Sequence, residues 1–132
     1  MKANGRVAVD SNAVIAYRAG VPEVCRLIDG AESIFMPVTV LGELLYGAMK
    51  SGRPAENEAA ARTFWSQCVP VYTDETVAFR YAAVRLALAL KGRPIPENDT
   101  WIAAACMEVD ALLISKDDHF KAVDGLDVVG WE

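Results

Sequence analysis

Three aspartates follow predicted strands or begin predicted helices, and their types and places suggest chemistry. Asp10 closes the apolar run Arg6–Asp10, Asp99 stands at the start of a predicted helix, and Asp117 follows the predicted strand Ala111–Ser115 by two residues. An aspartate at a helix start often only caps it, by accepting backbone N–H bonds. Capping does not explain why such residues would gather where parallel strands end, which is where α/β proteins bind ligands.

The helix that follows Asp99 indicates which way this carboxylate points. Ile102, Ala103 and Cys106 lie three, four and seven residues further on, so Asp99 heads an apolar, inward-facing stripe. A carboxylate on such a stripe needs a partner or a cation. Glu97 is the competing acid, but it precedes the expected helix and lies outside this register.

Glu43 lies in the middle of a predicted helix, Val38–Lys50, and is a weaker candidate. The apolar face of this helix is expected to consist of Val38, Leu41, Leu45 and Met49. Glu43 lies away from that face, so a solvated position is the simpler interpretation. Gly47 follows one turn later, where glycine costs about 1 kcal/mol relative to alanine. Its presence suggests that something packs closely there.

Strands alternate with helices along the chain, which predicts a parallel sheet with helices on both faces. We expect strands at Arg6–Asp10, Ser33–Met36, Val69–Tyr72, Ala111–Ser115 and Leu126–Val129. We expect helices at about 13–19, 22–30, 38–50, 54–67, 75–90, 98–109 and 117–123. Thr73 or Asp74 would cap the fifth of these helices, and Asn98 or Asp99 the sixth. The expected fold is a three-layer α/β/α domain with a mostly parallel sheet of about five strands, formed by residues 1–132 as one domain.

Composition excludes several classes of protein. Apolar residues make up 53% of the chain, which excludes a disordered protein. The balance of 13 basic and 18 acidic residues, a net charge of −5, argues against nucleic-acid binding through a general basic surface. No apolar stretch is long enough to span a membrane, and the first residues lack the apolar core of a secretory signal. Three widely spaced cysteines indicate reduced thiols, so we expect a cytoplasmic protein.

Four segments together resemble one family. VAVDSNAVIAY resembles the opening strand and turn of PIN domains, VTVLGELLYGA their E-L-x-x-G helix, IPENDTWIAAAC their third acidic segment and LLISKDDHF their fourth. The order and spacing hold over nearly the whole chain. Within this family, the pattern is most similar to the VapC-type toxins of bacterial and archaeal toxin–antitoxin pairs.

The resemblance implies a set of site residues. The acidic cluster of the family falls on Asp10, Glu43, Asp99 and Asp117, which would act in catalysis and as metal ligands. Ser11, Asn12 and Ser115 would be the polar neighbours of these ligands. Asp118 competes with Asp117, which we prefer because of its spacing from Ser115. His119 is expected to be a loop or surface residue.

The resemblance also implies an activity and partners. Carboxylates without paired histidines or cysteines suit one or two Mg²⁺ or Mn²⁺ ions. The expected reaction is hydrolysis of RNA to products with 5′-phosphate and 3′-hydroxyl ends. A VapB-like antitoxin would cover the acidic groove, and the chain would form a homodimer. Basic residues near the acidic segments could contact RNA phosphates: Arg18, Lys50, Arg53, Arg93, Lys116 and Lys121.

Three alternatives can be compared with this interpretation. A haloacid-dehalogenase-like phosphatase needs a second aspartate two residues after the first, where this chain has Asn12. A phospho-acceptor receiver domain needs paired acids after the first strand, and these are missing. A PIN fold that only binds RNA or protein remains the alternative function. Binding of RNA without any dependence on metal would favour it.

Overall fold

The computed structural model describes residues 4–132, which form one five-stranded parallel sheet in the order β3-β2-β1-β4-β5. The strands are β1 (Arg6–Val9), β2 (Ser33–Pro37), β3 (Val69–Val71), β4 (Leu112–Ile114) and β5 (Val128–Val129). All five predicted strands are present; β4 and β5 are each two residues shorter than expected, and the other three agree to within one residue. The first three residues, part of the segment expected to lack a secretory signal, lie outside the described residues.

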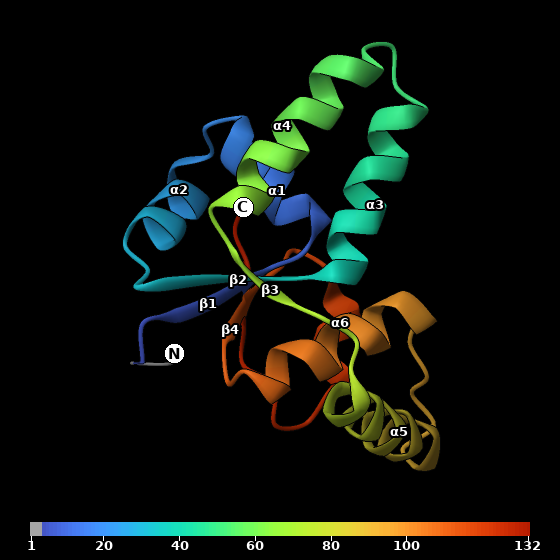
Figure 1. The fold of residues 1–132 in the computed structure, drawn as a ribbon. Helices are drawn as coiled ribbons and strands as arrows, with labels where there is room; N and C mark the ends of the chain where they lie inside the picture. The colour runs from blue at the N-terminus through green and yellow to red at the C-terminus, as the bar shows by residue number, and fades with distance from the viewer. Residues whose placement is uncertain (1–3) are drawn as a thin grey trace.

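Helices lie on both sides of the sheet, which gives the expected three layers (Figure 1). They are α1 (Ser11–Arg18), α2 (Pro22–Asp29), α3 (Val38–Met49), α4 (Pro54–Ser66), α5 (Glu75–Leu90), α6 (Glu97–Glu108) and the 3₁₀ helix η1 (Asp118–Ala122). Figure 1 shows α1, α2 and α4 on one side of the sheet and α5 and α6 on the other. The described residues contain no helix long and apolar enough to cross a membrane.

The central strands form the core and fix the positions of the residues that follow them. Ala8 and Val9 of β1 and Leu113 and Ile114 of β4 are fully buried. Val9 pairs with Ile114 in parallel register. The next residue on each strand therefore emerges at the same edge of the sheet, and on β1 that residue is Asp10.

Helix α6 begins earlier than predicted. Asn98 or Asp99 was expected to cap it, but the helix starts at Glu97, directly after Pro96, and no side chain caps it. The extended backbone of Pro96 (φ −53°, ψ 145°) ends the preceding loop and leads into the first turn. Asp99 therefore lies inside the first helical turn, where its carboxylate is not used as the cap.

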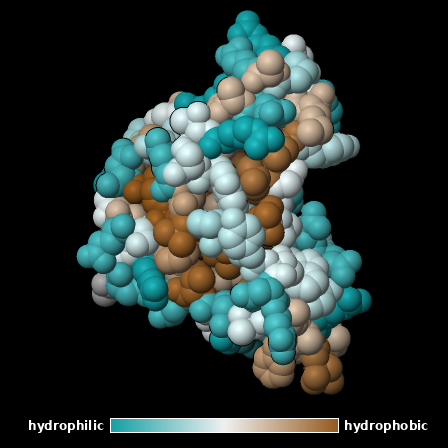
Figure 2. All heavy atoms as spheres, in the orientation of Figure 1, coloured by the Kyte–Doolittle hydropathy of each residue, from teal (hydrophilic) through white to brown (hydrophobic). Residues whose placement is uncertain are grey.

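The buried face of α3 also differs from the prediction. Val40 and Ala48 are the buried residues of this helix, whereas Met49, expected on the apolar face, is 65% exposed. Apolar residues occur on several sides of α3, so their spacing did not single out one face. Figure 2 shows a central area of hydrophobic residues on one face of the molecule, bordered by hydrophilic residues.

Candidate active site

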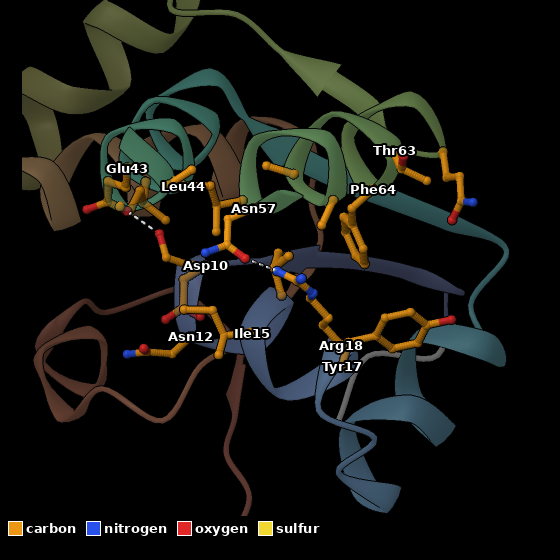
Figure 3. A pocket seen from close by; sticks show the side chains of 18 of the residues that line it. Asp10, Asn12, Ile15, Tyr17, Arg18, Glu43, Leu44, Asn57, Thr63 and Phe64 are labelled. Carbon is orange, nitrogen blue, oxygen red and sulfur yellow. Dashed lines mark hydrogen bonds between the residues drawn. The ribbon is translucent and has the colours of Figure 1, made fainter. Parts of the chain in front are cut away.

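One pocket of about 850 Å³ is lined by all four acidic residues that the sequence singled out. Asp10 reaches it from the end of β1, Glu43 from α3, Asp99 from α6 and Asp117 from the turn before η1. Figure 3 shows Asp10 and Glu43 with the other labelled residues of the pocket. Residues up to 107 positions apart in the sequence thus share one cavity at the carboxyl edge of the sheet.

Asp10 is the most buried of the four acids, with only 5% of its surface exposed. One carboxylate oxygen caps α1 by accepting the backbone N–H of Ala13 at 2.9 Å, and the other accepts a hydrogen bond from Ser115 Oγ. Burial raises the pKa of Asp10, and the nearby charges of Asp117 and Asp99 raise it further, against the lowering by these hydrogen bonds. The candidate site carboxylate and the cap of α1 are therefore the same residue.

Asp99 faces the same cavity from the first turn of α6, and its side chain is only 15% exposed. Burial is the main cause that raises its pKa, and Asp117 and Glu43 add electrostatic repulsion. A hydrogen bond from His119 acts in the opposite direction. Two neighbouring carboxyls with raised pKa values indicate that the protein alone does not fully compensate their negative charge.

Glu43 is held in place by polar neighbours from two other helices. Ser11 Oγ donates to Glu43 Oε1 at 2.7 Å, and Asn98 Nδ2 approaches Glu43 Oε2 at 3.5 Å. The glutamate is thus partly buried and turned toward α1, which corrects the expectation of a solvated face. The helical pattern missed this because the side chain is bound by residues distant in sequence.

Asp117 and Asp118 lie in different surroundings. Asp117 lines the pocket, its backbone N–H donates to Ser115 Oγ at 3.0 Å, and its carboxylate caps η1 by accepting the N–H of His119. The side chain of Asp118 is 85% exposed and forms an ion pair with Lys121 at 2.9 Å, which lowers the pKa of Asp118. This geometry favours Asp117 over Asp118 as the fourth acid.

The three predicted polar neighbours are placed differently from one another. Ser11 binds Glu43, and Ser115 links Asp10 to the backbone of Asp117. Asn12 is exposed, and Figure 3 shows it on the side of the pocket opposite Glu43. Among the described residues, the two serines therefore orient carboxylates and Asn12 only borders the cavity.

His119 lies within the acidic cluster, although the sequence suggested an ordinary loop residue. Its Nδ1 atom is 3.0 Å from Asp99 Oδ2 and 3.0 Å from Asp117 Oδ1. These three residues offer ligand atoms that all lie within 4.8 Å of one another, a group that could hold a metal ion. The sequence signal that could have revealed this contact is the position of His119 two residues after Asp117. The 3₁₀ helix η1 then brings the two side chains to the same side.

The pocket continues away from the acids between α1 and the α3–α4 pair. Its wall there is largely apolar and includes Leu44, Ala61 and Phe64. Arg18 also lines it, where its guanidinium donates to Asn57 Oδ1 at 2.9 Å, as drawn in Figure 3. The cavity therefore combines an acidic end with an apolar groove that contains one arginine.

Comparison with known proteins agrees with this arrangement. The family model described as PIN domain matches residues 7–126, which include all four acids. The chain belongs to the PIN domain family. Ribonuclease VapC5 of Mycobacterium tuberculosis is 30% identical over 124 residues, which cover 89% of this chain and 87% of that protein. The tRNA(fMet)-specific endonuclease VapC of Shigella flexneri is 32% identical over 92 residues, 69% of this chain and 70% of that protein.

A solved structure gives the same result for the PIN fold. The DNA-bound VapBC complex of Salmonella typhimurium contains a chain with a TM-score of 0.85 and 25% sequence identity to this one. The match covers 96% of this chain and 98% of that chain. The parallel sheet and its flanking helices are thus those of PIN domain proteins, and the acidic pocket lies within the matched region.

Proposed function

We propose that this PIN domain chain is a Mg²⁺- or Mn²⁺-dependent endoribonuclease and acts as the toxin of a toxin–antitoxin pair in the cytoplasm. Residues 1–132 would form its single domain. The observation that carries the proposal is the convergence of Asp10, Glu43, Asp99 and Asp117 on one pocket. The naming of related chains as VapC ribonucleases supports the reaction class.

The donor atoms of the pocket fit a hard divalent cation. Carboxylate oxygens are the ligands that Mg²⁺ and Mn²⁺ prefer. The raised pKa values of Asp10 and Asp99 add a physical reason, because a nearby cation would favour the ionised form of both groups. We assign Asp10, Glu43 and Asp99 as the residues that hold the main ion, directly or through water. Asp117 would complete a second site or position the attacking water.

The residues of the chain have distinct tasks in the proposed hydrolysis. A bound divalent cation supplies positive charge to the phosphodiester and acidifies water. Ser115 keeps Asp10 oriented, Ser11 keeps Glu43 oriented, and Asp117 is close enough to the cluster to direct a water molecule. Water adds its oxygen to phosphorus, the bond from phosphorus to the 3′ oxygen breaks, and that oxygen leaves with a proton. The products carry 5′-phosphate and 3′-hydroxyl ends.

RNA binding by an acidic protein must rely on local cations. Arg18 is the basic residue that lines the pocket itself, and its side chain is half exposed. Arg18 is 3.9 Å from the acidic Glu56, whereas Arg53 and Lys121 form closer ion pairs, at 3.0 Å with Glu56 and at 2.9 Å with Asp118. We therefore expect Arg18 to contribute more to RNA binding than these two residues.

The proposed partners are a VapB-like antitoxin and a second copy of the chain. The relative of known structure is a VapBC complex, and the apolar groove beside the acids gives a peptide segment a place to bind. An arginine of the antitoxin would pair well with the carboxylates because a guanidinium binds carboxylates through two parallel hydrogen bonds. Homodimer formation rests on the resemblance to this family.

Cleavage of a mixed RNA pool by the purified protein tests the proposed function. We expect cleavage with Mg²⁺ or Mn²⁺, none in EDTA, and 5′-phosphate ends on the products. Asp10→Asn and Asp117→Asn should each reduce the rate by at least about 100-fold, which corresponds to about 2.7 kcal/mol of activation free energy. Asp118→Asn is the matched control, because it removes the adjacent, exposed acid and should leave the rate unchanged.

Two results would contradict the proposal. Cleavage that persists in EDTA or in Asp10→Asn would exclude these carboxylates as its metal site. A folded protein that binds RNA in EDTA and cleaves no RNA with either metal would indicate the alternative, a PIN fold used only as a binding scaffold. The antitoxin must be absent from the preparation, which a denaturing gel establishes.

A further inference from the structure

The single histidine of the chain occupies the space between two of the proposed metal ligands. His119 Nδ1 lies 3.0 Å from an oxygen of Asp99 and 3.0 Å from an oxygen of Asp117. Asp99 comes from α6 and Asp117 from the end of the loop after β4, so two separate elements converge on one imidazole nitrogen. The four acidic segments that resemble the PIN family do not require a histidine at position 119.

Hydrogen bonding alone accounts for only part of this contact. An imidazole Nδ1 carries at most one proton, so it can donate one well-formed hydrogen bond at a time. Here two carboxylate oxygens lie at the same distance from it. The other ring nitrogen, Nε2, does not supply the second hydrogen bond, because both acids lie against Nδ1. Without a metal, a protonated imidazole can pair with both carboxylates, whereas a bound cation would contact the nitrogen and both oxygens at once.

Two of the contacts in this cluster match the edge length of a coordination octahedron. Ligand atoms about 2.1 Å from a metal and at right angles to each other are about 3.0 Å apart. Both distances from His119 Nδ1 have this value, and each of the three residues offers a ligand atom within 4.8 Å of those of the other two. The side chain of Asp99 is 15% exposed and that of His119 is 50% exposed, so an ion can enter from the open side.

The backbone holds the imidazole in this place. His119 N donates to Asp117 Oδ1 at 2.9 Å, which fixes the first residues of η1 against the acid. Phe120, the next residue, is almost completely buried and anchors the turn in the core. The direction of His119 toward the acids is thus set by the local fold.

We infer that His119 Nδ1 is a third protein ligand, beside Asp99 and Asp117, of a divalent cation, and that the site binds first-row transition-metal ions in preference to Mg²⁺. This rests on the proposed function, since it concerns the second ion site of the same pocket, the one that Asp117 would complete. A nitrogen donor has this effect because imidazole suits transition metals, whereas Mg²⁺ favours oxygen ligands and retains its water.

Pulsed electron paramagnetic resonance of bound Mn²⁺ tests the inference without any measurement of activity. A directly coordinated imidazole gives ¹⁴N couplings to Mn²⁺, and in a protein without an affinity tag these can arise from His119 as the only histidine. We expect the couplings in the wild-type protein and in Asp118→Asn, which changes an exposed neighbour. They should be lost in His119→Gln.

Calorimetric titration of the same three proteins gives the selectivity. His119→Gln should weaken Co²⁺ binding by about 10-fold or more and change the Kd for Mg²⁺ by less than about threefold. Bound Mn²⁺ without ¹⁴N coupling, coupling that persists in His119→Gln, or equal losses for both metals would overturn the inference. If Mg²⁺ still supports cleavage in these cases, the proposed function stands and only the role of His119 falls. Absence of any metal binding, together with absence of cleavage, would overturn both.

Discussion

Ser115 connects two of the four carboxylates through a single hydroxyl group. It donates to Asp10 and accepts the backbone N–H of Asp117, and it is 3% exposed. Ser115→Ala should lower the rate of RNA cleavage by about 10- to 100-fold, as loss of a partner that orients a metal ligand does. Ser115→Thr keeps the hydroxyl and should restore most of the rate. Equal loss in both variants would mean that packing, and not the hydroxyl, is what matters.

Asp10 should also make the stability of the metal-free protein depend on pH. Its pKa is raised in the folded state, so its protonated form stabilises the fold below the ordinary value of 3.8. That contribution is lost as the pH rises through the raised pKa. In EDTA, Asp10→Asn should therefore gain stability relative to wild type as the pH rises from about 4 to about 7. Asparagine caps helices as well as aspartate does, so α1 should remain intact.

The measurement is urea unfolding in EDTA at several pH values. Asp118→Asn is an informative control, because the pKa of Asp118 is lowered by its pairing with Lys121. Its contribution is present above the ordinary pKa and is lost as the pH falls, which is the opposite sign. If the wild-type and Asp10→Asn curves ran parallel across this range, the burial of Asp10 would not penalise its charge.

At the scale of elements, features that depend on residues close in sequence were predicted well, and contacts between elements were not. Asp10 was expected as a possible cap and Asp74 as one of two candidates with Thr73, because an N-cap bonds to residues within one turn. The face of α3 that carries Glu43 was assigned to solvent, because the serine that binds it lies 32 residues away. The N-cap of α6 was placed two or three residues late, since Pro96 can lead into a helix without a side-chain cap.

Helix α3 contains two interior glycines whose replacement should stabilise it. A Cβ atom added at Gly42 or at Gly47 would meet no atom within 4 Å, so the close packing suggested for Gly47 is not provided by the described residues. Gly47→Ala should raise the free energy of unfolding by about 0.5–1 kcal/mol, because alanine loses less backbone entropy in a helix. Gly42→Ala, which does not line the pocket, should give the same gain.

Urea denaturation of these two variants checks the prediction. A similar gain in both variants would show that the folded chain does not require a glycine at position 47. Its place in the pocket wall would then be explained by a molecule that enters the groove. A loss of stability for Gly47→Ala alone would contradict the open geometry at that position.

At the scale of the molecule, the topology explains why the site was largely predictable. In a parallel sheet, residues that follow adjacent strands meet at one edge, which brings Asp10 and Asp117 together from the neighbouring strands β1 and β4. The apolar stripe that follows Asp99 already directed this acid inward, whereas Glu43 required the resemblance to the PIN family, since no local rule directs α3 toward that edge. The place of His119 in the cluster was missed because it depends on a 3₁₀ turn and on a carboxylate 20 residues away.

A divalent cation should therefore stabilise the whole protein by relieving repulsion at this edge. Ligand at about 100 times its Kd adds about 2.7 kcal/mol to the free energy of unfolding. We expect Mg²⁺ or Mn²⁺ to raise the Tm of the wild-type chain and to raise that of Asp99→Asn much less. The net charge of −5 makes general screening a competing cause, so NaCl of matched ionic strength is the control. An equal rise with NaCl, or an equal rise in Asp99→Asn, would mean that the ion acts on overall charge and not at the four carboxylates.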